Sequence, residues 1–410
     1  MNTPITSVAE MQGVYGAYSF SEHLLQKIWL RGDFDRAGAI TTAGERVRIL
    51  HPGQWNRLGG PDFKNTRLQL GDGPEIVGDV ELHLRAEDWT AHRHASDPAY
   101  ARVVLHVVLF PPAAGYATRG GTGVIIPILS LLTLLRHDLE EFAADEAMER
   151  LAARPAGRIV EELGSLPLAE LEARLRSLAG GRWRQKVHFA RLRVQRLGWD
   201  AACHQTALEI LGYRFNRSPM LRLAARFPLE SWASGRATVE TLLAAESEGW
   251  SLQGVRPANQ PRARLTQYMA WAQARPDWPK RLAAVGKIWS QLSAEAVTRE
   301  VRREHGFGPK RTLLAEKICG GAVGGSRLET LVVDGLLPLA AAQGAMEAEL
   351  FGAWFHWFPG DLPPLVPQAL RDLGVVTPKR QPATNGFAQG LLGWWWQREA
   401  ASAPSEGRGA

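Results

Sequence analysis

The chain has 410 residues, which is too long for a single hydrophobic core and predicts more than one domain. Hydrophobic residues make up 45% of the sequence and charged residues 22%, a balance that excludes a disordered or fibrous protein. The formal net charge of +6 permits a polyanionic partner without requiring one.

Several classes of protein are excluded by what the sequence lacks. The two cysteines, Cys203 and Cys319, do not have the spacing of a disulfide framework or a structural zinc site. The N-terminus does not have the pattern of a signal peptide, and the longest apolar stretch, 124–135, is too short to span a bilayer. We therefore expect a cytoplasmic protein without a membrane partner. The phosphate loops of ATPases and dinucleotide enzymes and the serine-hydrolase elbow are also missing.

In chain order, the first predicted element is an amphipathic helix over 19–31, with Ser21 as its cap and Glu22 in its first turn. Alternating residues from Val47 predict a strand, and two more strands are predicted over 63–70 and 76–85, joined by the turn GDGP. In the last of these strands, side chains on one face are apolar, whereas the other face carries Asp79, Glu81, His83 and Arg85.

The continuously apolar run at 103–110 predicts a strand that is buried on both faces of a mixed sheet, and 123–129 predicts one more strand. We expect His106, inside that run, to be a buried core histidine. From about residue 130 the pattern is helical, and Gly180-Gly181 is expected to separate a helix over 166–178 from one over 183–197. Further helical segments are predicted over 201–212, 237–247, 262–274, 280–300 and 311–318.

The predicted fold class is therefore α+β. An N-terminal α/β module with a small mixed sheet is expected over 15–130, followed by a large, mostly helical region over 131–402. The polar residues 403–410 are expected to form a disordered tail.

The predicted chemistry is concentrated on two carboxylates. Asp62 stands at the start of one strand and Glu81 lies within the next, so a hairpin can bring them side by side. Two carboxylates form a hard oxygen site suited to Mg²⁺ or Mn²⁺. His83 points to the same face as Glu81, from which it can orient water, deprotonate it, or bind the metal itself.

This spacing resembles the PD-(D/E)XK nuclease superfamily, with Pro61-Asp62 and Glu81-Leu82-His83 standing where the PD and ExK motifs stand. The resemblance implies a restriction-endonuclease-like α-β-β-β-α-β core, divalent metal on the carboxylates, and a further glutamate on the first helix, which Glu22 matches. The sequence departs from the superfamily at His83, which replaces the lysine that helps to activate water. The segment 85–100 also leaves room only for a short core helix.

The histidine-rich run DWTAHRHASD, at 88–97, is similar to a segment of the very-short-patch mismatch repair endonucleases of the same superfamily. The likeness implies that His92 and His94 act as acid and base or contact phosphate. The alternative is a polar loop in which Asp88 caps a short helix at Trp89.

The chain also resembles, over most of its length, an uncharacterised bacterial family, domain-of-unknown-function family 2851. This resemblance implies a shared architecture and no established activity. The matching segments are EHLLQKIW (22–29), GPDF (60–63), VELH (80–83), the run at 88–97, Y-x-x-VVLHVV (100–108) and RPANQP (256–261).

Three basic segments, 182–199, 256–264 and 299–311, are candidates for contacts with a phosphate backbone. The alternative for each is a solvated basic face or a capped helix entry. The candidate nucleic-acid-binding residues are Arg182, Lys186, Arg193, Arg196, Arg256 and Arg264.

Three hypotheses follow. The first is a Mg²⁺- or Mn²⁺-dependent nuclease in which Asp62 and Glu81 bind the metal, Glu22 assists, and His83 activates water. The second is a nuclease fold that has lost turnover and binds nucleic acid or a protein. The third is a histidine-based zinc or iron hydrolase that acts on a small substrate through His83, His92 and His94.

Overall fold

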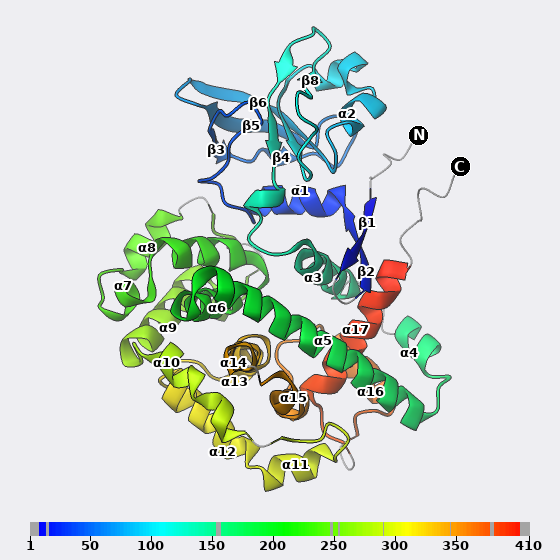
Figure 1. Cartoon of the computed structure of the whole chain (residues 1–410), viewed down its shortest axis with the longest axis vertical. Coiled ribbons are helices and arrows are strands. Elements are labelled where there is room, and N and C mark those ends of the chain that lie inside the picture. The colour runs from blue at the N-terminus through cyan, green and yellow to red at the C-terminus, as the bar shows by residue number, and fades with distance from the viewer. Residues whose placement is uncertain are drawn as a thin grey trace. The chain divides into compact units, whose positions relative to one another are not determined.

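The computed structural model describes residues 8–13, 16–152, 157–246, 249–252, 255–289, 291–344, 346–377 and 381–401. The chain forms two compact units (Figure 1). A sheet unit takes in the chain up to Ala147 and its end from Glu399, and a helical unit runs from Met148 to Arg398. Within the described ranges, every helix is too short or too polar to cross a membrane.

The sheet unit is built on one mixed sheet with the strand order β10-β7-β6-β5-β3, and β4 pairs with β5 at the side. β5 runs antiparallel to both of its neighbours, β3 and β6, whereas β6, β7 and β10 run parallel to one another. The strands are β1 (Val8–Gly13), β2 (Gly16–Ser21), β3 (Val47–His51), β4 (Gln54–Trp55), β5 (Phe63–Leu70), β6 (Glu75–His83), β7 (Val103–Val108), β8 (Thr118–Arg119), β9 (Ile125–Ile126) and β10 (Ile128–Ser130).

Helix α1 (Glu22–Arg31) covers one face of this sheet, where its apolar side chains pack against those of β5, β6 and β7 in the main core. The other face carries two small apolar clusters, centred on Ala86 and Trp89. They involve α2 (Asp88–Ala91), the one-turn helices η1 (His94–Ser96) and η2 (Pro98–Tyr100), and the β8–β9 hairpin. The candidate site lies on this second face.

The predicted mixed sheet and α+β class are confirmed, and the strand over 63–70 has the expected bounds. The first helix begins at Glu22 rather than residue 19, because 16–21 form β2, and Ser21 caps the helix by accepting the Leu24 N–H at 3.2 Å. β6 ends at His83, two residues before the predicted end. The run at 123–129 forms two short strands, because Pro127 interrupts it.

The helical unit is a bundle with α14 (Leu337–Gly344) in its interior, since the residues of this helix from Leu337 to Ala341 are all buried. α5 (Leu168–Leu197) packs against α6 (Trp199–Arg226), α14 and α15 (Glu347–His356). The remaining elements are α3 (Leu139–Ala152), which begins in the sheet unit, α4 (Gly157–Leu163), α7 (Leu229–Ala233), α8 (Val239–Ala245), α9 (Pro261–Ala274), α10 (Trp278–Ala283), α11 (Thr298–Glu304), α12 (Phe307–Leu313), α13 (Gly325–Leu331), α16 (Leu365–Asp372) and α17 (Asn385–Ala401).

The predicted break at Gly180-Gly181 is wrong, because α5 continues through both glycines as one helix of 30 residues. Each glycine costs about 1 kcal/mol relative to alanine in a helix interior. That cost is offset by the buried stripe that continues through this point, which includes Leu175, Ala179 and Trp183. Tertiary packing therefore overrides the local preference.

The helix predicted over 280–300 is also wrong. α10 ends at Ala283, a short 3-10 turn spans Val285–Ile288, and α11 begins at Thr298. α6 is longer than predicted, with non-helical backbone at Tyr213 and Asn216 inside it. At the C-terminal end of the described chain, α17 is packed into the helical unit, because its residues Trp394 and Trp395 are buried. The predicted tail, 403–410, lies outside the described residues.

The crossing of α17 over α5 depends on Gly390, since a Cβ there would clash with the Leu175 backbone carbonyl. We expect Gly390→Ala to destabilise the helical unit by about 1–3 kcal/mol, because overpacking at a backbone contact forces the helices apart. Thermal unfolding followed by circular dichroism measures the effect. Gly308→Ala in α12 is the matched control, and we expect it to be neutral or stabilising, because no described heavy atom lies within 4 Å of its Cβ position.

Candidate metal centre

The register of β5 against β6 places the two predicted carboxylates opposite each other. Phe63 pairs with Val80, so Asp62, the residue before β5, lies next to Glu81, whose side chain alternates with the core residues Val80 and Leu82. The Asp62 N–H donates to Glu81 Oε2 at 3.0 Å, and the Leu82 N–H donates to Asp62 Oδ2 at 3.0 Å. The two acids are therefore held together by backbone hydrogen bonds.

Helix α1 adds two side chains to this pair. The Gln26 amide donates to Asp62 Oδ1 at 2.6 Å, and its own oxygen accepts the Trp55 indole N–H at 3.1 Å. Glu22, one helical turn earlier, is buried, and its charge is among the causes that raise the pKa of Glu81. Glu22 is thus near enough to Glu81 to influence its ionisation, as the predicted role beside the carboxylates requires. Sequence reasoning missed Gln26, although its spacing of four from Glu22 places both on one helix face.

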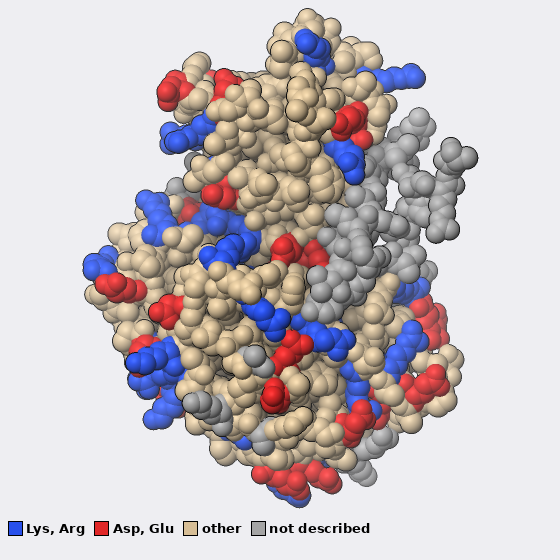
Figure 2. Space-filling model, in the orientation of Figure 1, with Lys and Arg blue, Asp and Glu red and all other residues tan. Residues whose placement is uncertain are grey.

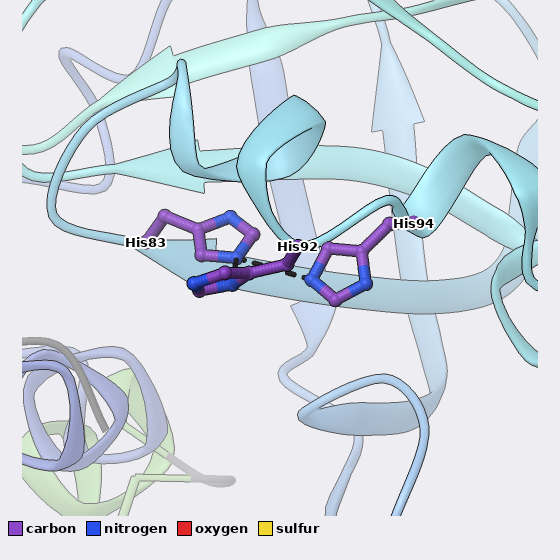
Figure 3. A group of neighbouring side chains, drawn as sticks. All are labelled: His83, His92 and His94. Carbon is purple, nitrogen blue, oxygen red and sulfur yellow. Dashed lines mark hydrogen bonds between the residues drawn. The ribbon is translucent and has the colours of Figure 1, made fainter. Parts of the chain in front are cut away.

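Three histidines converge on one another, as Figure 3 shows, and Glu81 lies beside two of them. His83 Nε2 lies 3.2 Å from His92 Nδ1 and 3.2 Å from His94 Nε2. His83 is the last residue of β6, and His92 follows the short helix α2. Arg93, with φ 59°, has left-handed backbone that turns the chain between His92 and His94. This turn brings two histidines spaced by two residues to the same point.

Glu81 closes the group on one side. Its Oε1 lies 3.4 Å from His94 Nε2 and 3.7 Å from His83 Nε2, whereas its Oε2 is occupied by the Asp62 N–H. One carboxylate oxygen therefore faces the imidazole nitrogens, and the other is held by the backbone. Both Asp62 carboxylate oxygens accept hydrogen bonds, from Gln26 and from the Leu82 N–H, and the Asp62 N–H orients Glu81.

A buried chain of hydrogen bonds supports His83 from the opposite side. His83 Nδ1 lies 2.9 Å from His106 Nε2, and His106 Nδ1 lies 2.7 Å from Thr118 Oγ1. If His83 Nε2 keeps its lone pair, Nδ1 must carry the proton, and both links of the chain then have a donor and an acceptor. His106 is buried as predicted. It also fixes the tautomer of His83, as partners of metal-binding histidines do.

Aromatic rings enclose the cluster. Tyr100 stacks on the His94 ring with centroids 3.9 Å apart, and Trp89 meets the same ring edge-on at 5.3 Å. The Trp89 indole N–H donates to the Arg119 carbonyl at 3.0 Å, which fixes the ring. A short helix forms at Trp89 as expected, but Asp88 is the first residue of this helix, and Glu87 occupies the cap position. Tyr100 was missed, because its distance from His94 in space depends on the two one-turn helices between them.

The electrostatics of the cluster favour neutral imidazoles. Burial lowers the pKa of His83 well below its usual range, and mainly burial lowers the pKa of His94 to about 4 and that of His106 to about 3. Burial, and then the charge of Asp62, raises the pKa of Glu81, whereas burial raises the pKa of Asp62 to about 7. Neutral imidazoles present lone pairs, which is the state that binds a metal ion.

Hydrogen bonding alone leaves the cluster incompletely satisfied. One imidazole nitrogen holds either a proton or a lone pair, so His83 Nε2 can be hydrogen-bonded fully to only one of its two nitrogen neighbours. A cation at the centre would satisfy all the lone pairs. The 3.2 Å separations of His83 Nε2 from the His92 and His94 nitrogens are close to the ~3.3 Å edge of a tetrahedron with bonds of about 2.0 Å, the usual zinc–nitrogen length. The three histidines thus form a donor group that fits a divalent transition metal, and Glu81 Oε1 lies beside two of them, His83 and His94.

The predicted nucleic-acid-binding residues lie in the helical unit, where several have partners inside it. Lys186 pairs with Asp334 at 2.8 Å and Arg193 with Glu209 at 2.7 Å. Arg182 donates to Gln185, and Arg264 to Asn259 and Gln267, and both arginines are buried, whereas Arg196 and Arg256 are exposed. On the face drawn in Figure 2, basic and acidic side chains are interspersed over the described residues rather than gathered by sign.

Comparison with known proteins places the chain in a family. The family model described as Protein of unknown function (DUF2851) matches residues 22–245, more than half of the chain. The chain belongs to this family. The match begins at Glu22 and takes in all the residues of the candidate metal centre. No match was found among curated proteins or among solved structures.

If the cluster binds one divalent ion, Thr118→Val should weaken the affinity for Zn²⁺ or Mn²⁺ about 10- to 100-fold, because His106 loses its acceptor and no longer fixes His83. Competition with a chelating dye measures the affinity. Thr118→Ser keeps the hydroxyl and should retain wild-type binding, and His51→Ala, an exposed histidine of the same unit, is the surface control. Equal affinities for Thr118→Val and wild type would contradict the supporting role of this chain.

Proposed function

We propose that the sheet unit is a divalent-metal-dependent phosphodiesterase of the nuclease kind, with the metal held by Glu81, His83, His92 and His94. The observation that carries the proposal is the convergence of three imidazole nitrogens that all lie within 4.8 Å of one another, with one Glu81 oxygen 3.4 Å from His94 and 3.7 Å from His83. Such a group, with two buried histidines and one exposed member, His92, suits a metal that a substrate can approach.

The order of elements supports the nuclease part of the proposal. α1, β3, β5, β6, α2 and β7 follow the α-β-β-β-α-β order that the PD-(D/E)XK resemblance implies. Asp62 precedes the second of these strands and Glu81 lies in the third, the positions of the PD and ExK motifs. Glu22 opens the first helix. The short length of α2 remains a departure from that superfamily.

The donor set alters the expected cofactor. Two carboxylates suit Mg²⁺ or Mn²⁺, but a group with three imidazoles suits Mn²⁺, Fe²⁺ or Zn²⁺ better than Mg²⁺, because Mg²⁺ prefers oxygen ligands. In this proposal His83 becomes a metal ligand rather than a substitute for the superfamily lysine. When bound, such an ion supplies Lewis-acid polarisation of the ester and a water of lowered pKa.

The remaining residues act by orientation. The Asp62 N–H holds Glu81 Oε2, so Glu81 Oε1 is directed at the histidines. Gln26 anchors Asp62 from α1, and Tyr100 stacks on His94 and limits the movement of its ring. The arrangement is held in place before any substrate arrives, which is the condition for electrostatic stabilisation without reorganisation of the site.

A second candidate function is a histidine-based hydrolase of a small ester or amide. The specific observation in its favour is the group of three histidines, which resembles catalytic zinc sites more than it resembles an all-carboxylate site. The two functions share the metal and differ in the substrate, so one set of assays separates them.

We expect the metal-loaded protein to cleave DNA or RNA and bis(p-nitrophenyl) phosphate, and not p-nitrophenyl acetate. Glu81→Gln and His92→Ala should each lower the rate by more than about 100-fold, because the loss of a ligand exceeds the cost of losing an outer partner. Chelation by EDTA should abolish cleavage, and added Mn²⁺ or Zn²⁺ should restore it. Release of p-nitrophenol and gel electrophoresis of labelled strands provide the measurements.

Equal cleavage by wild type and by the Asp62→Ala/Glu81→Ala double variant would refute the proposal. Hydrolysis of the acetate ester alone would favour the second candidate. Binding of nucleic acid with no hydrolysis of any substrate would favour a nuclease fold without turnover. His51→Ala should behave as wild type in every assay, since His51 is exposed on β3 and lies outside the cluster.

A further inference from the structure

The loop that leads into Asp62 carries the most exposed large apolar side chain of the described residues. Leu58 is 83% exposed, and Arg57 beside it is also exposed. The loop is nevertheless braced from within, because the Asn56 side chain donates to the Pro61 carbonyl at 2.8 Å and accepts the Leu58 N–H at 3.2 Å. We call residues 55–60 the lip. Its exposed side chains are thus held out on an ordered loop.

The base of the lip is an aromatic surface connected to the candidate site. Trp55 stacks on the buried Phe63 ring at 6.2 Å, and the Arg57 guanidinium lies 4.5 Å from the Trp55 ring centroid. The half-exposed His23 ring lies 5.3 Å from Trp55. The Trp55 indole N–H donates to Gln26, which in turn donates to Asp62. Arg57 therefore rests on a ring, Trp55, that is linked to the Asp62 carboxylate by two hydrogen bonds through Gln26.

The other end of the lip reaches the histidine side of the site. A Cβ on Gly60, whose φ is +96°, would lie 3.7 Å from the Ala99 side chain. Ala99 belongs to η2, whose last residue, Tyr100, stacks on His94. The lip therefore adjoins both the carboxylates and the residues that enclose the histidines.

The chemistry of the lip matches an unpaired nucleobase. Arginine and aromatic surfaces stack on bases that are not already stacked in a helix, and the arginine charge also attracts the neighbouring phosphate. An exposed leucine on a braced loop can pack against the face or edge of such a base. A duplex offers its bases only in the grooves, where a short lip with one cation makes few contacts.

We propose that the lip binds an unpaired base next to the phosphodiester at the metal centre, so that single-stranded nucleic acid is the preferred substrate class. This inference rests on the proposed function, since it assigns the substrate of the same site. Arg57 and Leu58 are its specificity residues, and Trp55 is the support on which Arg57 rests.

Binding can be measured without cleavage by fluorescence anisotropy, using the full-length Glu81→Gln variant and wild type in EDTA. Labelled 12-nucleotide single strands of DNA and of RNA, and the matching DNA duplex, are the probes. We expect tighter binding of a single strand than of the duplex. Arg57→Ala and Leu58→Ser should each weaken single-strand binding by about fivefold to 100-fold, the range measured for the loss of one stacking contact.

Arg48→Ala and Val77→Ser are matched controls, because both residues are exposed in the same sheet unit, on β3 and near the start of β6. They should leave strand binding unchanged. Tighter binding of the duplex, or equal loss in the control and lip variants, would overturn the inference. The DNA and RNA arms identify which strand is taken.

The proposed function is tested separately by wild-type hydrolysis of bis(p-nitrophenyl) phosphate, which carries no nucleobase. If that substrate is hydrolysed and strand binding does not depend on Arg57 or Leu58, only the inference about the lip fails. If it is not hydrolysed and DNA and RNA remain intact, the proposed function fails, whatever the lip binds.

Discussion

The pairing of β5 with β6 is the constraint on which the candidate site depends. Phe63 and Val80 are opposite each other and both enter the main core, so Glu81 faces away from that core, and Asp62, one residue before β5, lies beside Glu81. A slip of one residue in β6 would turn Glu81 toward the apolar core and separate it from Asp62. The register shifts between Phe63 and Thr66, where Asn65 has φ 57° and its N–H donates to Asp79 at 3.1 Å. This bulge lets the rest of β5 continue its pairing without moving Asp62.

Burial then sets the character of the site. Glu81, His83 and His94 are all nearly inaccessible to solvent, and burial is the largest cause of their pKa shifts. Desolvation disfavours the charged form of each group, so the imidazoles are neutral and the carboxylate is costly to ionise. A bound cation would reverse that cost for Glu81. Without a cation, burial makes the ionised form of the cluster unfavourable. With a cation, the same burial would strengthen the attraction between the ion and its ligands, and our functional proposal rests on this difference.

The two units carry different kinds of polar network. In the sheet unit, buried polar groups point toward one another around a common centre. In the helical unit, Lys186, Arg193 and Arg264 are engaged by acids or amides of the same unit. Their charges are thus largely used in holding helices together, and a phosphate backbone would have to compete with those partners. This contrast is why the proposed substrate contacts lie on the lip and not on the basic helix.

Sequence periodicity by itself determined the mixed sheet, the bounds of β5, the cap at Ser21 and the shared face of Glu81 and His83. Those features follow from interactions between residues near one another in the chain, such as alternation and capping. The sequence also indicated the chelating potential of His92 and His94. Only the tertiary structure determined that these two histidines meet His83. The left-handed backbone of Arg93 and the position of α2 in the fold cannot be read from the spacing of residues in the sequence.

Gln26, Tyr100 and the support of His83 by His106 were likewise decided only in three dimensions. Each involves residues more than five positions apart whose contact depends on helix placement and strand register. The continuity of α5 through Gly180-Gly181 has the same origin, since packing energy summed along the buried stripe exceeds a local glycine penalty. The conformational preference of a residue acts over about one turn of helix, whereas the free energy gained by burial is summed over contacts throughout the unit. The sequence could therefore indicate which residues carry the chemistry, but only the packed structure determined which atoms face one another.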